Sequence, residues 1–231
     1  INKMLIVKKS DPNNDDYDTI IFAINDIETV EIPASIVCIG SSSFAGCDKL
    51  KSVTFSDESK LRIINRKAFS KSSIKSISIP PRVKYIRESA FSKCTNLSSI
   101  EFSENSELYS IDCYTFSESS IESIKIPSNV TLIGQRAFQY CSSLSSVEFA
   151  ENSKLLTIEK EAFYKSSIET ISLPSSVKEI KEGWISYVRK LKNISISKDN
   201  KYFTYYNNSI ILGKNNENDE EYSNLLFARR D

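Results

Sequence analysis

An isoleucine or leucine returns along this chain at spacings that alternate strictly between 23 and 24 residues, at Ile27, Leu50, Ile74, Leu97, Ile121, Leu144, Ile168 and Leu191. A fixed period between about 20 and 50 residues is typical of a repeat architecture, in which each unit buries its apolar face only against its neighbours. The chain is therefore expected to fold as an elongated array. The surface that this array repeats becomes the first place to look for function.

Each of these residues opens a hexamer with apolar side chains at positions one, four and six. Positions four and six lie two residues apart and are rich in β-branched side chains, which predicts a short strand. In alternate repeats a proline follows the hexamer directly and ends the strand, because proline has no N–H to give to a ladder. These prolines are Pro33, Pro80, Pro127 and Pro174.

A phenylalanine stands at one equivalent position in six repeats, five residues beyond a second apolar pair: Phe44, Phe69, Phe91, Phe116, Phe138 and Phe163. Stacked repeats would place these rings in one internal column. Burying each ring would contribute roughly 1.5–3 kcal/mol. We interpret this aromatic stripe as the spine of the core, not as a cofactor site.

The hexamer matches the start of a leucine-rich repeat, L-x-x-L-x-L, although no asparagine ladder follows the strand. The longer pattern I-P-x-x-V-x-x-I-G-x-x-A-F-x-x-C is complete at 126–141. This pattern resembles the BspA-like leucine-rich repeats of surface proteins, and the resemblance covers 27–196. It implies a β-rich leucine-rich-repeat solenoid with a parallel concave sheet on one wall, and with short strands, turns and helical turns on the other.

The two ends of the chain resemble each other. Shifting 5–26 by 205 positions onto 210–231 places Tyr17 on Tyr222 and Phe22 on Phe227. Each segment has two apolar stretches around an acidic, Asn-rich loop, which predicts a β-hairpin. We therefore expect a hairpin insert or cap at 1–26, a solenoid of seven full repeats plus a final strand at 27–196, and a second hairpin insert or cap at 197–231. By the same match, another repeat block is expected to follow residue 231.

Composition argues against several classes of function. The chain has 30 basic and 30 acidic residues, so it carries no net charge that would indicate a nucleic acid or an anionic membrane as partner. It has no histidine, which removes the commonest general base and metal ligand. The carboxylates of Glu31, Glu101 and Glu148 lie two or more strands apart. We predict no enzyme, no cofactor, no metal and no direct membrane insertion by this segment.

Three of the five cysteines, Cys47, Cys94 and Cys141, recur 47 residues apart. Two strand spacings separate them by roughly 9–10 Å, whereas a disulfide needs Cα atoms within about 7 Å. They should be buried apolar residues that form neither a disulfide with one another nor a zinc site. Because the number of cysteines is odd, at least one thiol is expected to be free or to bridge to another chain.

The outward face of the predicted strands is the main candidate binding surface. Positions three and five of each hexamer point away from the core, and they are mostly small hydroxyl residues without the Trp, Tyr or Arg anchors of tight interfaces. Either this face binds weakly and multivalently, to glycans or a repetitive ligand, or it is only solvated. Its residues are Thr29, Glu31, Ser52, Thr54, Ser76, Ser78, Ser99, Glu101, Ser123, Lys125, Ser146, Glu148, Thr170, Ser172, Asn193 and Ser195.

Two further sets of residues are candidates. An aromatic patch is expected beside the second hairpin, formed by Tyr202, Phe203, Tyr205 and Tyr206. Four N-x-S/T sequons permit N-glycosylation in a secreted protein, at Asn96, Asn129, Asn193 and Asn207. Trp184 replaces the alanine expected in its repeat, and it is either a packing residue at the hairpin or an exposed anchor.

The family resemblance implies a cell-surface or secreted recognition module that mediates adhesion to host cells, matrix or other microbes, with a protein or glycan as ligand. Fold alone does not choose a function. An intracellular scaffold or assembly protein is the main alternative, and a structural spacer is the lesser one.

Overall fold

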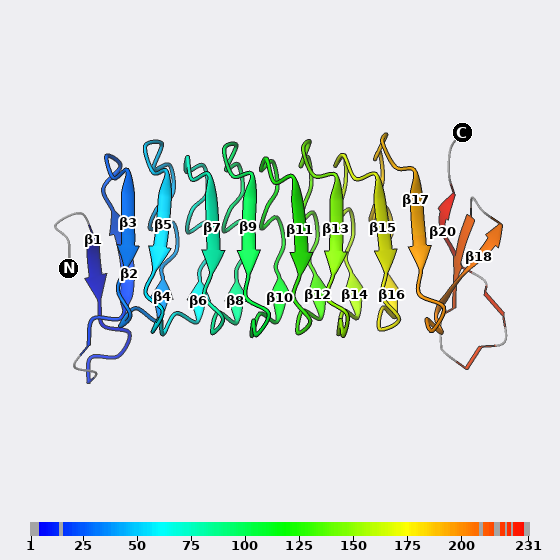
Figure 1. Ribbon diagram of the computed structural model, residues 1–231, viewed down its shortest axis with the longest axis horizontal. Coiled ribbons are helices and arrows are strands. Elements are labelled where there is room, and N and C mark those ends of the chain that lie inside the picture. The colour runs from blue at the N-terminus through cyan, green and yellow to red at the C-terminus, as the bar shows by residue number, and fades with distance from the viewer. Residues whose placement is uncertain are drawn as a thin grey trace.

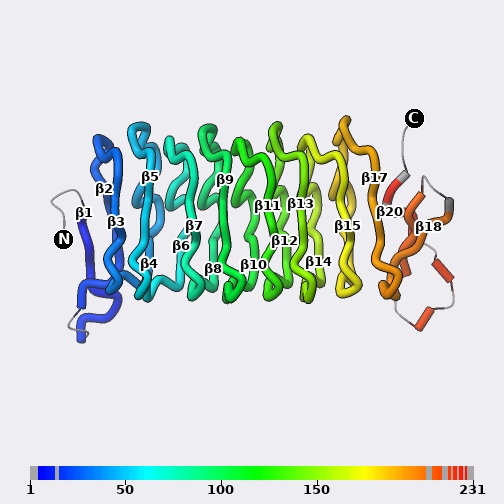
Figure 2. The backbone as a smooth tube through the Cα atoms, viewed as in Figure 1, coloured from blue at the N-terminus to red at the C-terminus, as the bar shows by residue number. Residues whose placement is uncertain are grey.

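The computed structural model describes residues 5–13, 16–207, 210–214, 218–219, 221–222 and 224–228. The chain winds into a straight-sided solenoid with the two hairpin regions at opposite ends (Figure 1, Figure 2). Each turn contributes a four-residue strand to one wall, a two-residue strand to a second wall and a run of tight turns to a third. This arrangement confirms the repeat architecture that the period predicts.

The four-residue strands form the strand wall. Their order along the array is their order in the sequence, and neighbours are parallel. They are β3 (Thr29–Ile32), β5 (Ser52–Phe55), β7 (Ser76–Ile79), β9 (Ser99–Phe102), β11 (Ser123–Ile126), β13 (Ser146–Phe149), β15 (Thr170–Leu173) and β17 (Asn193–Ile196).

The second wall, called the short-strand wall below, is one continuous nine-stranded sheet. Seven of its strands have two residues: β4 (Cys38–Ile39), β6 (Ile63–Ile64), β8 (Tyr85–Ile86), β10 (Ser110–Ile111), β12 (Leu132–Ile133), β14 (Thr157–Ile158) and β16 (Glu179–Ile180). The hairpin β1 (Leu5–Lys8) and β2 (Thr19–Ala23) completes it, since β2 pairs with β4. At the other end, β18 (Phe203–Asn207), β19 (Ile210–Gly213) and β20 (Asn224–Ala228) form a separate antiparallel sheet.

The phenylalanine column is confirmed. The rings from Phe44 to Phe163 stack with centroids 5.0–5.6 Å apart and planes within 19° of parallel, and all six are fully buried. Trp184 ends the column, because it is buried and meets Phe163 edge-on at 6.3 Å. Trp184 is therefore a packing residue.

The third wall, called the turn wall below, consists of tight turns, and its described residues form no helix. The expected helical turns on this side of the solenoid were therefore a wrong prediction. Most repeats place two residues in the left-handed region, which interrupts any run of helical dihedrals. Backbone N–H groups of this wall also donate to the next repeat, as Phe69 does to Ala90 at 2.8 Å. They are thus not available for an i→i−4 ladder. Left-handed residues are Ser42, Gly46, Lys67, Lys71, Ser89, Lys93, Tyr114, Glu118, Arg136, Tyr140, Glu161, Lys165, Gly183 and Tyr187.

The cysteines behave as small buried residues in the middle of the array. Cys94 and Cys141 are fully buried, and their thiols donate to the carbonyls of Phe69 and Phe116 at 3.0 Å. Burial raises the pKa of each thiol to about 11. All five cysteines of the chain are unpaired. The prediction that the three periodic cysteines do not bridge to one another is thus confirmed.

Candidate functional site on the strand wall

The strand wall presents its hydroxyl residues in rows. Every outward position is exposed or half-buried, whereas the position-four side chains are buried. The register aligns position three of one strand with position three of the next, as Thr29 with Ser52 and Ser146 with Thr170. A line of Ser and Thr hydroxyls therefore crosses the wall and ends at Asn193 on β17.

Position five forms a second row, which carries the charges. Glu31, Glu101 and Glu148 are exposed on β3, β9 and β13, and Lys125 lies beside Glu148 in the register of β11 and β13. The hydroxyl of Ser78 donates to the carboxylate of Glu101 at 3.0 Å. The three carboxylates are separated along the array, and the structure does not bring them together.

Strands on this wall are grouped in pairs. Four residues are in register within the pairs β3/β5, β7/β9, β11/β13 and β15/β17. Between pairs the register is short, with one aligned residue for β5/β7 and two for β13/β15. Between β9 and β11 the sheet is divided into two. The wall therefore opens at every second junction.

The alternate prolines explain this opening. Within a pair, the residue after the second strand donates to the first strand, as Ala150 does to Ile126 at 3.1 Å and Ser197 to Leu173 at 3.0 Å. At the open junctions the equivalent residue is Pro80, Pro127 or Pro174. Proline has no N–H, so this ladder bond cannot form.

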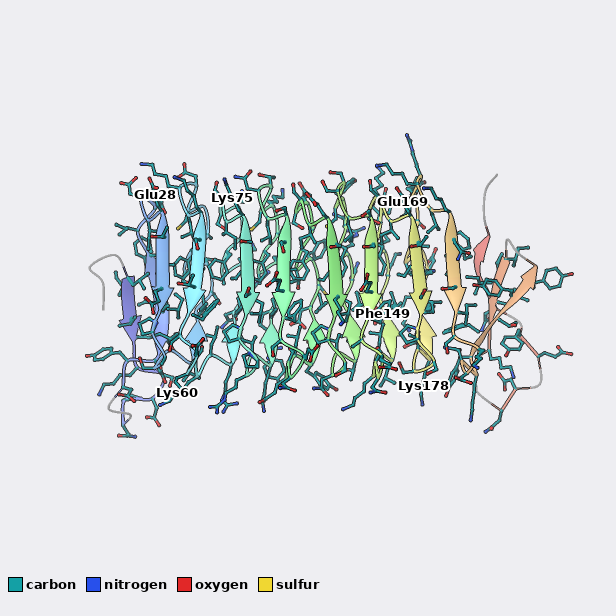
Figure 3. The ribbon with its side chains drawn as sticks, in the orientation of Figure 1. Glu28, Lys60, Lys75, Phe149, Glu169 and Lys178 are labelled. Atoms are coloured by element: carbon teal, nitrogen blue, oxygen red, sulfur yellow. The ribbon has the colours of Figure 1, made fainter. Side chains whose placement is uncertain are left out.

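Two of the open junctions form hollows. One, of about 650 Å³, is lined by residues of β13, β15 and β17, including Phe149, Thr170 and Ser172. The other, of about 420 Å³, is lined by β5 and β7 with Phe55 and Pro80. Phe149 lies at the end of its strand in Figure 3 and is half-buried. Each hollow therefore places one half-buried phenylalanine ring beside serine and threonine hydroxyls.

The predicted aromatic patch is divided by the structure. Phe203 is 4% exposed and belongs to the core, and Tyr202 is half-buried against it. Tyr205 is exposed on one side while its hydroxyl donates to the carbonyl of Ile194. Only Tyr206 is mostly exposed, at 72%. A four-residue aromatic surface at this place was therefore a wrong prediction.

A different aromatic surface lies on the turn wall, and sequence reasoning missed it. Tyr140, Tyr164 and Tyr187 meet edge-on, with ring centroids 5.6 and 5.4 Å apart. The ammonium of Lys165 lies 5.2–5.8 Å from all three ring centroids, and its pKa is raised, chiefly by Tyr140 and then by Tyr164. The sequence signal was available, because Tyr140 and Tyr187 occupy one repeat position two repeats apart.

The sequons differ in accessibility. Asn96 and Asn193 are exposed. Asn129 is half-buried, its amide nitrogen donates to the carbonyl of Ser106 at 2.9 Å, and its oxygen accepts from Lys154 at 2.8 Å. N-glycosylation of Asn129 would replace one of the two hydrogens on this amide nitrogen. The side chain of Asn207 lies outside the described residues.

The described residues contain no group of three or more His, Cys, Asp or Glu side chains arranged to hold a metal ion. Nor does any described segment form a helix of the length and apolar character that crossing a membrane requires.

The chain is similar to known repeat proteins. A family model described as the BspA type leucine-rich repeat region matches six copies, over 18–112 and 109–212. No curated protein matches the sequence.

Among solved structures, the pneumococcal vaccine antigen PcpA is similar over 85% of this chain and 47% of its own, with 24% identity and a TM-score of 0.64. A leucine-rich repeat protein from Bacteroides ovatus is similar over 85% and 57%, with 23% identity and a TM-score of 0.60. A leucine-rich cell surface protein from Faecalibacterium prausnitzii is similar over 81% and 43%, with 23% identity and a TM-score of 0.56.

At these identities the solved structures establish the shared fold, and this chain spans about half of their length. The family model covers most of the chain. The periodic hexamer, the stacked phenylalanines and the parallel strand wall are consistent with this match. The chain belongs to the BspA-type leucine-rich-repeat family.

Proposed function

We propose that this chain is a non-enzymatic recognition module, displayed at a cell surface or secreted, that binds a protein or glycan ligand through many weak contacts on the strand wall. The observation that carries the proposal is the aligned rows of exposed hydroxyls with a hollow at two of the open junctions. Family membership supports it, and so does the similarity in fold to a protein described as a cell surface protein.

The physical mechanism is repetition. A single hydroxyl hydrogen bond contributes only about 0.5–1.5 kcal/mol net, and the strand wall has no large exposed anchor of the kind that dominates tight interfaces. Two hollows on one rigid wall, roughly 20 Å apart at four strand spacings of about 4.8 Å, would engage a repetitive ligand together. Many copies on one surface would then multiply this effect.

The proposed binding mode is tested by displaying the chain on fluorescent beads and measuring adhesion to epithelial cell layers and a glycan array. A variant carrying Thr170→Arg and Ser172→Arg fills the larger hollow with charge. The matched control places Ser41→Arg and Ser142→Arg at exposed turn positions. We expect beads to bind where the single chain does not, the first variant to lose binding and the control to keep it. Equal binding by both variants would exclude the strand wall.

The proposed location is tested by staining intact source cells with an antibody against 27–196. A signal that mild external proteolysis removes would support surface display. A signal that requires permeabilisation would contradict it and favour the alternative of an intracellular scaffold or assembly protein, with which the five unpaired cysteines are compatible. Replacing 27–196 by an unrelated rigid solenoid would preserve function only if this segment is a spacer.

A further inference from the structure

The two hairpins are the same structural element. A shift of 205 residues carries β1 onto β19 and β2 onto β20 with identical bounds. It also carries the register across, because Ile6 pairs with Phe22 and Ile211 with Phe227. Even the bulge is retained, since it follows Ile6 in one hairpin and Ile211 in the other. The sequence match between the ends therefore reflects equivalent structure.

Equivalent side chains of the two hairpins have opposite burial. On one face, Ile6 is 55% exposed whereas its equivalent Ile211 is 2% exposed. The cross-strand partner follows the same rule, since Phe22 is 47% exposed and Phe227 is packed against the core.

The other face shows the reverse, because Ile20 is fully buried and its equivalent Leu225 is 65% exposed. Each hairpin thus has two apolar faces and covers a different one. The face carrying Ile6 or Ile211 is called the first face below, and the face carrying Ile20 or Leu225 is called the second face.

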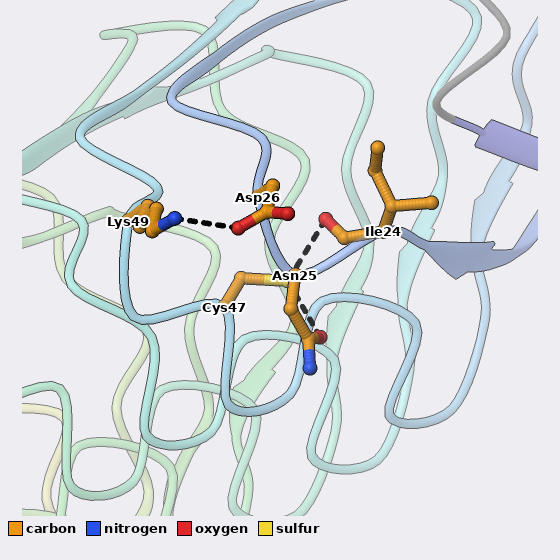
Figure 4. Close-up of polar contacts among 5 residues, drawn as sticks. All are labelled: Ile24, Asn25, Asp26, Cys47 and Lys49. Carbon is orange, nitrogen blue, oxygen red and sulfur yellow. Dashed lines mark hydrogen bonds and ion pairs between the residues drawn. The ribbon is translucent and has the colours of Figure 1, made fainter.

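The second face of the first hairpin is covered by the start of a repeat block. Ile20 aligns with Ile39 of β4, and the N–H of Gly40 donates to the carbonyl of Ile20 at 2.7 Å. A Cβ on Gly40 would lie 2.4 Å from that oxygen, so this approach requires glycine. An exposed ion pair between Lys49 and Asp26, at 2.6 Å, and the thiol of Cys47 near Ile24 mark the same junction (Figure 4).

The first face of the second hairpin is covered by the end of a repeat block. Phe203 of β18 and Ile211 are both buried in the core that the solenoid shares. The buried side chain of Asn200 joins the two parts, because its amide donates to Pro174 at 2.9 Å and its oxygen accepts from the N–H of Phe203 at 3.0 Å. The end of the block is thus fixed to the hairpin by apolar packing and by hydrogen bonds.

We infer that each hairpin is an adaptor between two solenoid blocks, with its first face built for the end of one block and its second face for the start of the next. The exposed Leu225 face is accordingly a docking site, and its occupant is the opening turn of a further leucine-rich-repeat block like 27–50. That turn would supply a β4-type strand beside β20 and a glycine equivalent to Gly40. This proposal rests on the first hairpin, where the equivalent surface is covered by β4 and Gly40 in this way.

The test is a tandem chain in which residue 231 is followed directly by a second copy of 27–231, since Asp231 is the equivalent of Asp26. X-ray scattering should show a rigid rod about twice as long, and amide exchange at Leu225 should slow by roughly tenfold or more relative to the single chain. The decisive variant is Leu225→Asp. We expect it to leave the melting temperature of the single chain unchanged, because Leu225 is exposed there.

In the tandem chain, Leu225→Asp in the first copy, which lies at the junction, should restore fast amide exchange at that position. It should also produce the scattering profile of a hinged, more compact molecule. Ile6→Asp is the matched control, because it adds the same charge to an exposed apolar residue of the first hairpin and should leave the tandem rod straight. Two blocks that tumble independently with or without Leu225→Asp would overturn the inference. Self-association of the single chain that Leu225→Asp abolishes would overturn the choice of occupant in favour of a second copy. Neither outcome depends on ligand binding by the strand wall.

Discussion

The short-strand wall and the strand wall of this solenoid are built by the same repeats, yet the first is continuous and the second opens at every second junction. In the short-strand wall each strand has its partners on both sides from β2 to β14. In the strand wall, Pro80, Pro127 and Pro174 remove one donor from alternate strands. We attribute the difference to one residue type, placed at every second repeat, because proline cannot supply the donor that extends the pairing.

Burial also differs between the phenylalanine column in the core and the open junctions of the strand wall. The rings from Phe69 to Phe163 each have an aromatic ring on both sides, and Phe44, at the end of the column, is fully buried as well. The phenylalanines that end β5, β9 and β13, which are Phe55, Phe102 and Phe149, are only half-buried because they lie at the open junctions. The internal column is therefore the most deeply buried part of the array, and the open junctions leave aromatic carbon partly exposed.

The largest expected effect comes from breaking the column. Phe91→Ala should destabilise the chain by about 3–5 kcal/mol, because it leaves a cavity between two stacked rings. Phe102→Ala, the same change at a half-buried ring, should cost about 1–2 kcal/mol, since less area returns to water. Urea unfolding followed by circular dichroism measures both. Equal losses would remove the energetic distinction between the column and the open junctions.

An effect that is intermediate in size for each thiol is expected from alkaline pH. The pKa of Cys94 and Cys141 rises from 9.0 to about 11 on folding, because burial disfavours the thiolate. This contribution is complete below pH 9.0 and is lost as the pH rises to about 11, where each thiol would forfeit about 2–3 kcal/mol.

Urea unfolding at pH values below 9.0 and near 11 measures this loss. Other groups titrate in the same range, so a variant with both cysteines changed to alanine is the reference. The original chain should lose more stability between the two pH values than the variant does. Parallel losses would contradict the assignment to these thiols.

The smallest effect on stability, and the sharpest test of the proline explanation, is Pro127→Val. The new N–H can donate to Phe102 and gain about 0.5–1.5 kcal/mol, while the freer unfolded chain offsets about 0.4–1 kcal/mol. The free energy of unfolding should thus change by less than about 1 kcal/mol. Hydrogen exchange should instead show a protected amide at position 127, with β9 and β11 joined into one sheet.

Pro33→Val is the matched control for this change, because Pro33 follows β3, which is the first strand of its sheet. Its new amide has no preceding strand to reach and should exchange quickly. Rapid exchange at position 127 as well would show that the proline is not what holds the junction open.

The sequence by itself determined the features that depend on period and alternation. The spacing from Ile27 to Leu191 fixed the number and direction of the strands, the phenylalanine positions fixed the column, and the match of Tyr17 to Tyr222 located two equivalent hairpins. These are properties of a repeating pattern, in which each unit meets a copy of itself. For that reason neighbouring contacts could be inferred from one repeat.

Tertiary structure decided what depends on an unlike neighbour or on backbone conformation. Left-handed residues such as Tyr140 and Lys165 replaced the expected helical turns and aimed a cluster of tyrosines at solvent. The block end buried Phe203 and Ile211, while the equivalents of the covered faces, Ile6 and Leu225, stayed in water. A side-chain pattern states which residues are apolar, but burial is set by what lies against them. The ends of an array are where a repeat no longer supplies that neighbour.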